Sequence, residues 1–391
     1  MADASRDRLL TPAFALLWAI TFVTFFAAFM MFPTVPLRLR EMGASLAESG
    51  RFLAVFTAGS AVGALFTGPL GDRVGSRRMV VCTALLFALF VLAYGLVPHR
   101  GWIYALAPLH GFVWSGLLTA TMALLGGVLP LERRADGMSL YGLASPAGVV
   151  LGPLAGLELQ QRWPFLALCA GIFAGFVLLG LLAFTLPRDP AHAEHRPFFR
   201  LPDRVMTGPC AVLFATALGY GSLGPYTAQE GKLLGFPVFA GFSTASAFLS
   251  CMGLGMVAMR VVMARVGFGK RPVRMVPVML LGSAGSLALL ALLPGGLGRH
   301  ALAGLLYGAG YSMVHTLVST QVLELVPPER RGAAFGATLF SFDAGIGLGS
   351  FLLGLVIGHA GFRVGWAGAA LATLAAVPLA RRLAQSPKVS S

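Results

Sequence analysis

The chain has 391 residues, of which 57% are hydrophobic and only 11% charged, and its mean hydropathy is +0.80. So small a polar fraction excludes a soluble globular protein of this length and makes the lipid bilayer the expected solvent. The formal net charge of +14 is distributed in short clusters along the chain, whereas a nucleic-acid-binding protein would gather it in one soluble domain.

Apolar stretches of about 20 residues or more recur, which is the length that a helix needs to cross roughly 30 Å of hydrocarbon. They are apolar on every face, as at residues 80–97, which favours helices over the alternating segments of an outer-membrane barrel. Six spans are expected in the first half of the chain, at residues 12–36, 46–70, 79–98, 101–129, 136–159 and 164–186. Six more are expected in the second half, at residues 206–228, 237–263, 273–294, 299–326, 333–358 and 363–380.

Residues 187–203, between these two sets of spans, are rich in Pro, Arg, His and Asp and contain no apolar run, as is typical of a linker. We therefore predict an all-α membrane protein with twelve transmembrane helices. Its expected parts are a six-helix half at residues 1–186, a cytoplasmic linker at 187–205 and a second six-helix half at 206–391.

Most of the 29 lysines and arginines fall in alternate connections between the spans. By the positive-inside rule, we expect both termini and the linker in the cytoplasm, with a multi-pass chain in a bacterial-type inner (plasma) membrane. The first apolar run, residues 12–37, is too long for a cleavable signal peptide and should remain as the first helix. Four cysteines within apolar runs are expected to pack as small residues without disulfides: Cys82, Cys169, Cys210 and Cys251.

The two halves repeat a local pattern. Residues 131–134 (LERR) precede the fifth expected span, and residues 328–331 (PERR) precede the eleventh. At the same offset, Gly152 corresponds to Gly349. Such internal repetition indicates two related bundles rather than one irregular array of helices.

Residues 68–78, between the second and third spans, read Gly-Pro-Leu-Gly-Asp-Arg-Val-Gly-Ser-Arg-Arg. This stretch resembles the signature loop of the major facilitator superfamily, whose fold of two six-helix halves carries out secondary transport. Glycines allow helices to approach closely, and the charged groups can form salt bridges that favour one conformation of a rocking bundle. The alternative is that the arginines only set topology, and the second copy of the motif has Ala264 in place of Asp72. The expected switch residues are Gly68, Gly71, Asp72, Arg73, Gly75, Arg77 and Arg78.

A second motif lies in the fifth span, where Gly148, Gly152, Pro153 and Gly156 resemble the Gly-Pro signature of the superfamily's proton-coupled exporters. Small residues every four positions allow close helix packing, and the proline bends the helix. This resemblance favours export, and generic small-residue packing is the alternative. Many such exporters carry an arginine in the fourth span, but residues 110–116 contain none.

Ionisable groups inside the bilayer are costly and are therefore default candidates for ion pathways. Asp343 lies near the middle of the eleventh expected span, and His315 lies near the middle of the tenth. Because a low-dielectric cavity disfavours a charged carboxylate, Asp343 could exchange a proton near neutral pH. Both residues are candidates for proton coupling. The alternative for Asp343 is a structural hydrogen bond to the facing helix, with His315 as one conceivable partner.

Other charged residues are expected at the extracytoplasmic ends of helices, where snorkelling or solvation by the loops accounts for them. They are Glu41, Glu48, Arg51, Glu158, Glu230 and Lys232.

The resemblance further implies a substrate cavity lined by the first, fourth, seventh and tenth spans. The polar and aromatic candidates there are Trp18, Thr21, Thr24, Phe25, His110, Trp114, Thr119, Tyr220, Tyr226, Gln229, Tyr307 and Tyr311. Because this set is aromatic and mostly uncharged, it suits an amphipathic solute better than a phosphate ester. For each aromatic residue, simple helix packing is the alternative.

Two other functions stay open. Met252 and Met256 could coordinate Cu(I) on one helical face, and the superfamily includes copper importers with such pairs, although Met is also an ordinary gap filler. Uptake of a small polar metabolite is the second. An enzyme is not expected, because the chain has no His-Glu-x-x-His, Gly-x-Ser-x-Gly or Walker-type motif.

We therefore predict a secondary active transporter that exports a small amphipathic organic solute in exchange for protons by alternating access. Its expected partners are the solute, protons and the lipid bilayer, with no cofactor and no nucleic acid. A monomer is expected, as is usual in this superfamily.

Overall fold

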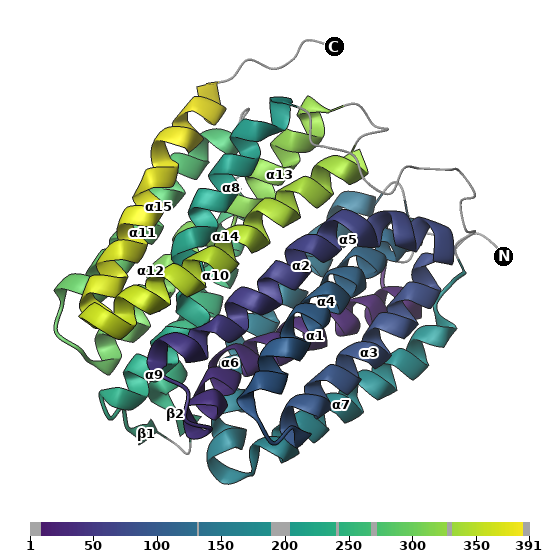
Figure 1. The fold of residues 1–391 in the computed structure, drawn as a ribbon. Coiled ribbons are helices and arrows are strands. Elements are labelled where there is room, and N and C mark those ends of the chain that lie inside the picture. Colours follow the sequence, from purple (N-terminus) through teal and green to yellow (C-terminus); the bar gives the residue numbers. More distant parts are fainter. Residues whose placement is uncertain are drawn as a thin grey trace.

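The computed structural model describes residues 9–130, 133–188, 204–239, 242–266, 272–326 and 331–385. Long helices run side by side along one main direction (Figure 1). At one end of the bundle, the two-residue strands β1 (Val238–Phe239) and β2 (Phe242–Ser243) pair antiparallel beside helix α9.

The first half of the chain forms helices α1 (Pro12–Glu41), α2 (Leu46–Val74), α3 (Ser76–Leu96), α4 (Arg100–Val128), α5 (Arg134–Tyr141), α6 (Ala144–Arg162) and α7 (Phe165–Leu182). The second half forms α8 (Thr207–Tyr220), α9 (Leu223–Leu233), α10 (Ala247–Val266), α11 (Val276–Leu292), α12 (Leu297–Tyr311), α13 (Val314–Leu325), α14 (Arg331–Ala360) and α15 (Phe362–Gln385). Short 3-10 turns are η2 (Ala183–Thr185), η3 (Arg204–Met206), η4 (Thr244–Ser246) and η5 (Pro272–Met275).

Within the described ranges, nine helical segments are long and apolar enough to cross a membrane, and the shorter apolar helix Ala247–Met263 accompanies them. The all-α membrane fold is therefore confirmed. The expected span at 136–159 falls on the consecutive helices α5 and α6, and the span at 206–228 falls on α8 and α9. A count of twelve spans is consistent with this arrangement, in which some spans are broken helices. Most of the expected linker, residues 189–203, lies outside the described residues.

Local sequence signals begin and end the helices. The Thr11 hydroxyl accepts a hydrogen bond from the Phe14 amide at 3.1 Å and caps α1. At the start of α2, Ser45 and Glu48 form a reciprocal capping box, with amide contacts of 3.1 and 2.7 Å. Gly75, with φ +93°, separates α2 from α3 in a conformation that other residues rarely adopt.

Several threonine hydroxyls within the spans are satisfied by their own helices. Thr24 donates to the Ile20 carbonyl at 2.6 Å, and Thr34 donates to the Met30 carbonyl at 2.7 Å. Thr121 makes the same bond to Leu117. An unsatisfied polar group in hydrocarbon costs several kcal/mol, so these bonds allow polar residues inside the membrane without a partner on another helix.

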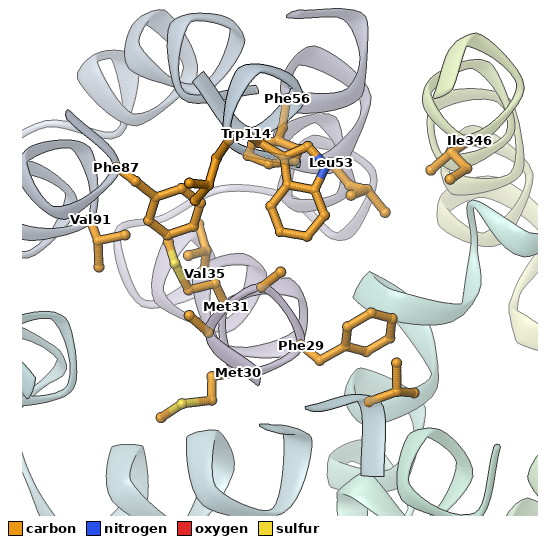
Figure 2. Packing of buried hydrophobic residues seen from close by; sticks show 14 of the residues in the cluster. Phe29, Met30, Met31, Val35, Leu53, Phe56, Phe87, Val91, Trp114 and Ile346 are labelled. Carbon is orange, nitrogen blue, oxygen red and sulfur yellow. The ribbon is translucent and has the colours of Figure 1, made fainter. Parts of the chain in front are cut away.

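The two sets of helices meet chiefly along two pairs, α2 with α14 and α6 with α10. Aromatic and aliphatic side chains fill the space beside these pairs. In Figure 2, Phe56 and Trp114 lie together in the N-terminal helices. Ile346 of α14 lies across from Leu53 of α2. Hydrophobic side chains of both sets therefore belong to one buried cluster.

Tyr226 of α9 lies between α2 and α14 and is fully buried. Its ring occupies space left by two glycines, because a Cβ at Gly50 or at Gly354 would overlap the Tyr226 hydroxyl. The hydroxyl donates to the Ser350 carbonyl at 3.4 Å, and the Ser350 hydroxyl donates to the Gly50 carbonyl at 3.0 Å. One side chain thus joins three helices.

Tyr226→Ala should destabilise the fold by about 3–5 kcal/mol, the usual cost of removing a buried aromatic ring. Tyr226→Phe keeps the ring and loses one long hydrogen bond, so its cost should be about 1 kcal/mol. Thermal unfolding of the purified protein in detergent measures both. An alanine variant that unfolds at the wild-type temperature would contradict this role of the ring.

Candidate functional site

The loop that resembles the superfamily signature holds the ends of three helices together. The Arg77 guanidinium donates to the carbonyls of Phe184 and Leu186, at 3.1 and 3.4 Å, just after α7. A Cβ at Gly71 would come 3.3 Å from the Met79 sulfur, so α2 and α3 are close there. The side chain of Asp72 lies outside the described atoms. The geometry therefore joins Arg77 to α7, and the switch role of the loop stays a prediction.

The glycines of the second motif lie where α6 meets α1. A Cβ at Gly148 would come 2.6 Å from the Phe26 nitrogen, and one at Gly152 would come 2.6 Å from the Phe26 carbonyl oxygen. A Cβ at Gly156 would lie 2.8 Å from the Met30 backbone. The three glycines thus form one face along which two helix backbones touch, as small residues at four-residue spacing allow.

Candidate residues on α1 reach two different neighbours. The Trp18 indole donates to the Leu140 carbonyl at 3.2 Å, and Thr21 shares a short hydrogen bond with Tyr141, so both connect α1 to α5. Phe25 instead contacts Trp114 of α4 edge-on, with ring centroids 5.3 Å apart. Thr24 bonds to its own helix.

The other candidates on α4 are buried among N-terminal helices. His110 packs against Phe56, Phe87 and Phe90, and its Nδ1 atom lies 3.1 Å from the Tyr94 hydroxyl. This is the environment of a packed imidazole. Thr119 accepts a hydrogen bond from Thr67 at 3.4 Å. The structure therefore does not bring these two residues to the tyrosines of the C-terminal helices.

Three candidate tyrosines of the C-terminal helices stack on one another. Tyr220 of α8 lies parallel to Tyr311 of α12 at 4.8 Å between centroids, and Tyr311 stacks on Tyr307 at 5.3 Å. Phe342 of α14 closes the group at 6.2 Å from Tyr220. Tyr226 and Gln229 lie elsewhere, at the end of the bundle near α9, where the Gln229 amide donates to Ser49 of α2 at 3.2 Å.

A polar stripe runs along α12 and α13 at four-residue spacing. Its members share one property: each carries a buried polar atom that has no hydrogen-bond partner in the described part of the chain. They are Tyr307, Tyr311, His315 and Ser319. Because unsatisfied buried donors are rare in folded proteins, the stripe is suited to bind a solute or water.

Asp343 of α14 lies beside this stripe and contacts the opposite set of helices. Its Oδ2 atom accepts a hydrogen bond of 2.5 Å from the hydroxyl of Ser60 on α2. It is close enough to Tyr311 for electrostatic interaction. A hydrogen bond from a facing helix, which was the structural alternative for Asp343, is therefore present, and Ser60 rather than His315 donates it. Proton coupling at Asp343 stays a prediction. His315 contacts the neighbouring Phe342 edge-on at 4.9 Å.

Sequence reasoning missed a charged cluster at the α9 end of the bundle. Glu230 is 4% exposed rather than solvated, and it accepts hydrogen bonds from Arg299 and Trp366. The seventh expected span ended before Glu230, but the buried part of α9 extends past it. The sequence did contain one signal for this cluster, because the basic residues Arg299 and His300 are adjacent at the start of the tenth expected span.

The two methionines considered as Cu(I) ligands, Met252 and Met256, make ordinary packing contacts. Met252 is fully buried, and its backbone lies directly against the backbone of Gly308 on α12. The Met256 carbonyl accepts a hydrogen bond from Ser312 at 3.2 Å. Both residues thus serve the contact between α10 and α12.

The apolar helical bundle and its glycine-lined contacts define a polytopic membrane protein with a buried polar stripe. A model of the Major Facilitator Superfamily matches residues 17–350, and the chain belongs to that family. The prediction made from the signature loop is therefore confirmed at the level of the family. Members of this family are transporters, so the chain is a multi-pass membrane transporter and not an enzyme.

Several characterised proteins are similar to the chain over part of their length. Multidrug resistance protein 2 of Bacillus subtilis is 27% identical over 173 residues, which cover 42% of this chain and 43% of that protein. Quinolone resistance protein NorA of Staphylococcus aureus is 26% identical over 203 residues, 48% of this chain and 50% of that protein. The aligned stretch thus spans half or less of each relative.

Solved structures share the whole fold. The nucleoside transporter NupG superposes with a TM-score of 0.71 over 96% of this chain and 100% of its own, at 12% identity. The human organic anion transporter MFSD10 superposes with a TM-score of 0.69 over 95% of this chain and 100% of its own, at 16% identity. At such low identity these likenesses concern the fold alone.

Gly152→Ala should destabilise the protein by about 1–3 kcal/mol, because the new methyl group has to displace the α1 backbone. The matched control is Gly171→Ala on α7, where a Cβ would meet no atom within 4 Å. Thermal unfolding and solute transport in proteoliposomes compare the two variants. If both behave like the wild type, the close approach of α6 and α1 is not needed.

Proposed function

We propose that this transporter exports small amphipathic organic solutes from the cytoplasm in exchange for protons, by alternating access. The moving parts are the two six-helix halves, residues 1–186 and 206–391, joined by the linker at 187–205. The observation that carries the proposal is the Asp343 carboxylate, held by Ser60 at the contact between α2 and α14.

Asp343 is suited to couple a proton to a movement of the halves. Ionised, its carboxylate accepts the Ser60 hydroxyl hydrogen and ties α14 to α2. Protonation removes the negative charge and so weakens this charge-assisted bond. One proton thereby changes the strength of a contact between the two halves, which is what a rocking mechanism requires. His315 packs against Phe342, and its Nε2 atom has no hydrogen-bond partner among the described residues, so it is the second candidate for the proton path.

The surroundings of Asp343 support an amphipathic solute. Tyr220 and Tyr311 present stacked aromatic faces, and the Tyr307 and Tyr311 hydroxyls have no protein partner in the described residues. Apolar walls with a few convergent polar groups are typical of sites for small organic molecules. A carboxylate among aromatic rings also favours solutes that carry a positive charge.

The direction of transport is inferred from two sources. Both bacterial relatives carry resistance in their names, Multidrug resistance protein 2 and NorA. The glycine face of α6, with Pro153 inside the helix, has the spacing of the exporter-like signature. We place the protein in the plasma membrane of a bacterial-type cell, as a monomer with both termini in the cytoplasm.

Two variants separate the proton role of Asp343 from its structural role. Asp343→Asn removes the titratable group but keeps an oxygen that can accept from Ser60. Ser60→Ala keeps the carboxylate but removes the bond between the halves. We expect Asp343→Asn to abolish proton-coupled transport of lipophilic cations and neutral drugs, with at least a tenfold loss, about 1.4 kcal/mol or more. Ser60→Ala should still bind the proton at Asp343 but couple it more weakly to transport, with a smaller loss than that of Asp343→Asn.

The measurement is solute flux with a pH-sensitive dye inside proteoliposomes. If Asp343→Asn still couples protons to solute, the carboxylate is not the coupling site. If Ser60→Ala loses transport as fully as Asp343→Asn does, the pair serves only as a structural tie. Movement of Cu(I) alone, lost on Met256→Leu, would replace export by metal uptake.

A further inference from the structure

An apolar groove lies on the first half of the chain, over helix α4 and between α2 and α3. Helix α4 packs against both of these helices, whereas α2 and α3 make few contacts with each other (Figure 1). The groove has a volume of about 220 Å³ and is lined by residues within 67–74 of α2, 79–86 of α3 and 112–116 of α4. The residues proposed above to bind solute and protons do not line it.

The groove opens toward the outside of the bundle. On its α3 wall, Cys82 and Leu86 are exposed, whereas Thr67 on the α2 wall is fully buried. On α4, Leu109 lies two helical turns before Gly116 on the same face and is 56% exposed. Because an exposed apolar face of a membrane helix lies against lipid, the groove is accessible to acyl chains.

The hydroxyl groups of the groove already have partners, so its surface is apolar. Thr83 donates to the Met79 carbonyl at 2.6 Å, and Thr67 donates to Thr119 at 3.4 Å. A Cβ at Gly116 would come 3.1 Å from the Thr83 methyl carbon and 3.4 Å from that of Thr67. The methyl groups therefore face the base of the groove. Since an apolar cavity of about 150 Å³ holds a benzene molecule, this groove has room for a run of methylene groups.

A basic residue lies at one end of the groove, near the connection between α2 and α3. Arg78 is exposed and lies one turn before Cys82 on the same face of α3. Helical side chains lean toward the N-terminus of their helix, so the Arg78 guanidinium extends beyond the end of the groove. Within the described ranges, no hydrogen bond or ion pair holds Arg78. Arg77, by contrast, is held by the carbonyls that follow α7.

We infer that this groove binds an anionic phospholipid, with one acyl chain in the groove and the headgroup beside Arg78. An apolar channel that ends at an exposed cation complements a molecule with a hydrocarbon chain and a negative head. A lipophilic cation would gain nothing from Arg78, which is why the occupant is a lipid and not the proposed solute.

The proposed orientation places this lipid in one leaflet. With both termini in the cytoplasm, the connection between α2 and α3 is cytoplasmic, and the lipid belongs to the cytoplasmic leaflet. Lipid binding itself does not depend on the orientation or on the proposed transport activity.

Native mass spectrometry of the full chain tests the inference, with phosphatidylglycerol or phosphatidylcholine of identical acyl chains added in detergent. The wild type should bind the first phosphatidylglycerol about fivefold more tightly than phosphatidylcholine, the effect of one arginine near an anionic headgroup. Arg78→Gln should make the two affinities equal. Cys82→Phe places a ring in the groove and should weaken both lipids by about fourfold or more, the equivalent of one methylene group removed from apolar contact.

Two matched variants serve as controls. Arg274→Gln removes another exposed arginine, which precedes α11 in the second half of the chain. Leu89→Phe enlarges an exposed side chain of α3 that does not line the groove. Both should bind the two lipids as the wild type does. Thermal unfolding in lipid-free detergent checks that every variant keeps the wild-type fold.

Three outcomes overturn the inference. The first is equal binding of the two lipids by the wild type. The second is a loss of preference in Arg274→Gln as large as that in Arg78→Gln, which would mean diffuse attraction of lipid to a basic surface. The third is unchanged lipid binding in Cys82→Phe. If that variant instead weakens binding of the lipophilic cation tetraphenylphosphonium, the groove takes a solute and not a lipid.

Discussion

The contact between α2 and α14 is the constraint on which the rest of the bundle depends. Glycines on α14 bring the two helices together, since a Cβ at Gly347 would come 2.6 Å from the Thr57 hydroxyl and one at Gly336 would come 2.9 Å from the Ala64 carbonyl. Lipid offers no hydrophobic force between helices, so van der Waals packing and hydrogen bonds supply the attraction. The Ser60–Asp343 bond lies between these close approaches.

Polar groups are placed at distinct depths along this bundle. Asp343 and the stripe on α12 and α13 lie in its interior, where Tyr220 and Tyr311 provide aromatic surface. The Glu230 cluster lies toward the α9 end. Elsewhere, threonines are satisfied by the carbonyl one turn earlier in their own helix. Since an unpaired polar group in hydrocarbon is costly, the groups without local partners are where function is to be sought.

Two of the spans that carry these groups are broken helices. The seventh span is divided at Gly221 and Ser222 into α8 and α9, and the tenth is divided at Ser312 and Met313 into α12 and α13. The break in the seventh span lets α9 wedge Tyr226 between α2 and α14 and present Gln229 and Glu230 to different neighbours. A continuous seventh span would hold the side chains of α9 to the periodicity of α8.

The sequence by itself determined the membrane class, the approximate positions of the spans and the family, because apolar length and the Gly-Asp-Arg motif at residues 68–78 are local signals. It also singled out Asp343, since a carboxylate within an apolar run is conspicuous without any structure. Only the tertiary structure decided which groups meet. Ser60 donates to Asp343 although the two residues are 283 positions apart.

Glu230, assigned from the sequence to a solvated helix end, is buried against Arg299 and Trp366. His110, a cavity candidate by its span, lies inside an aromatic core. The local sequence specifies which residues share a face of each helix. Which helix that face contacts depends on how all the helices pack.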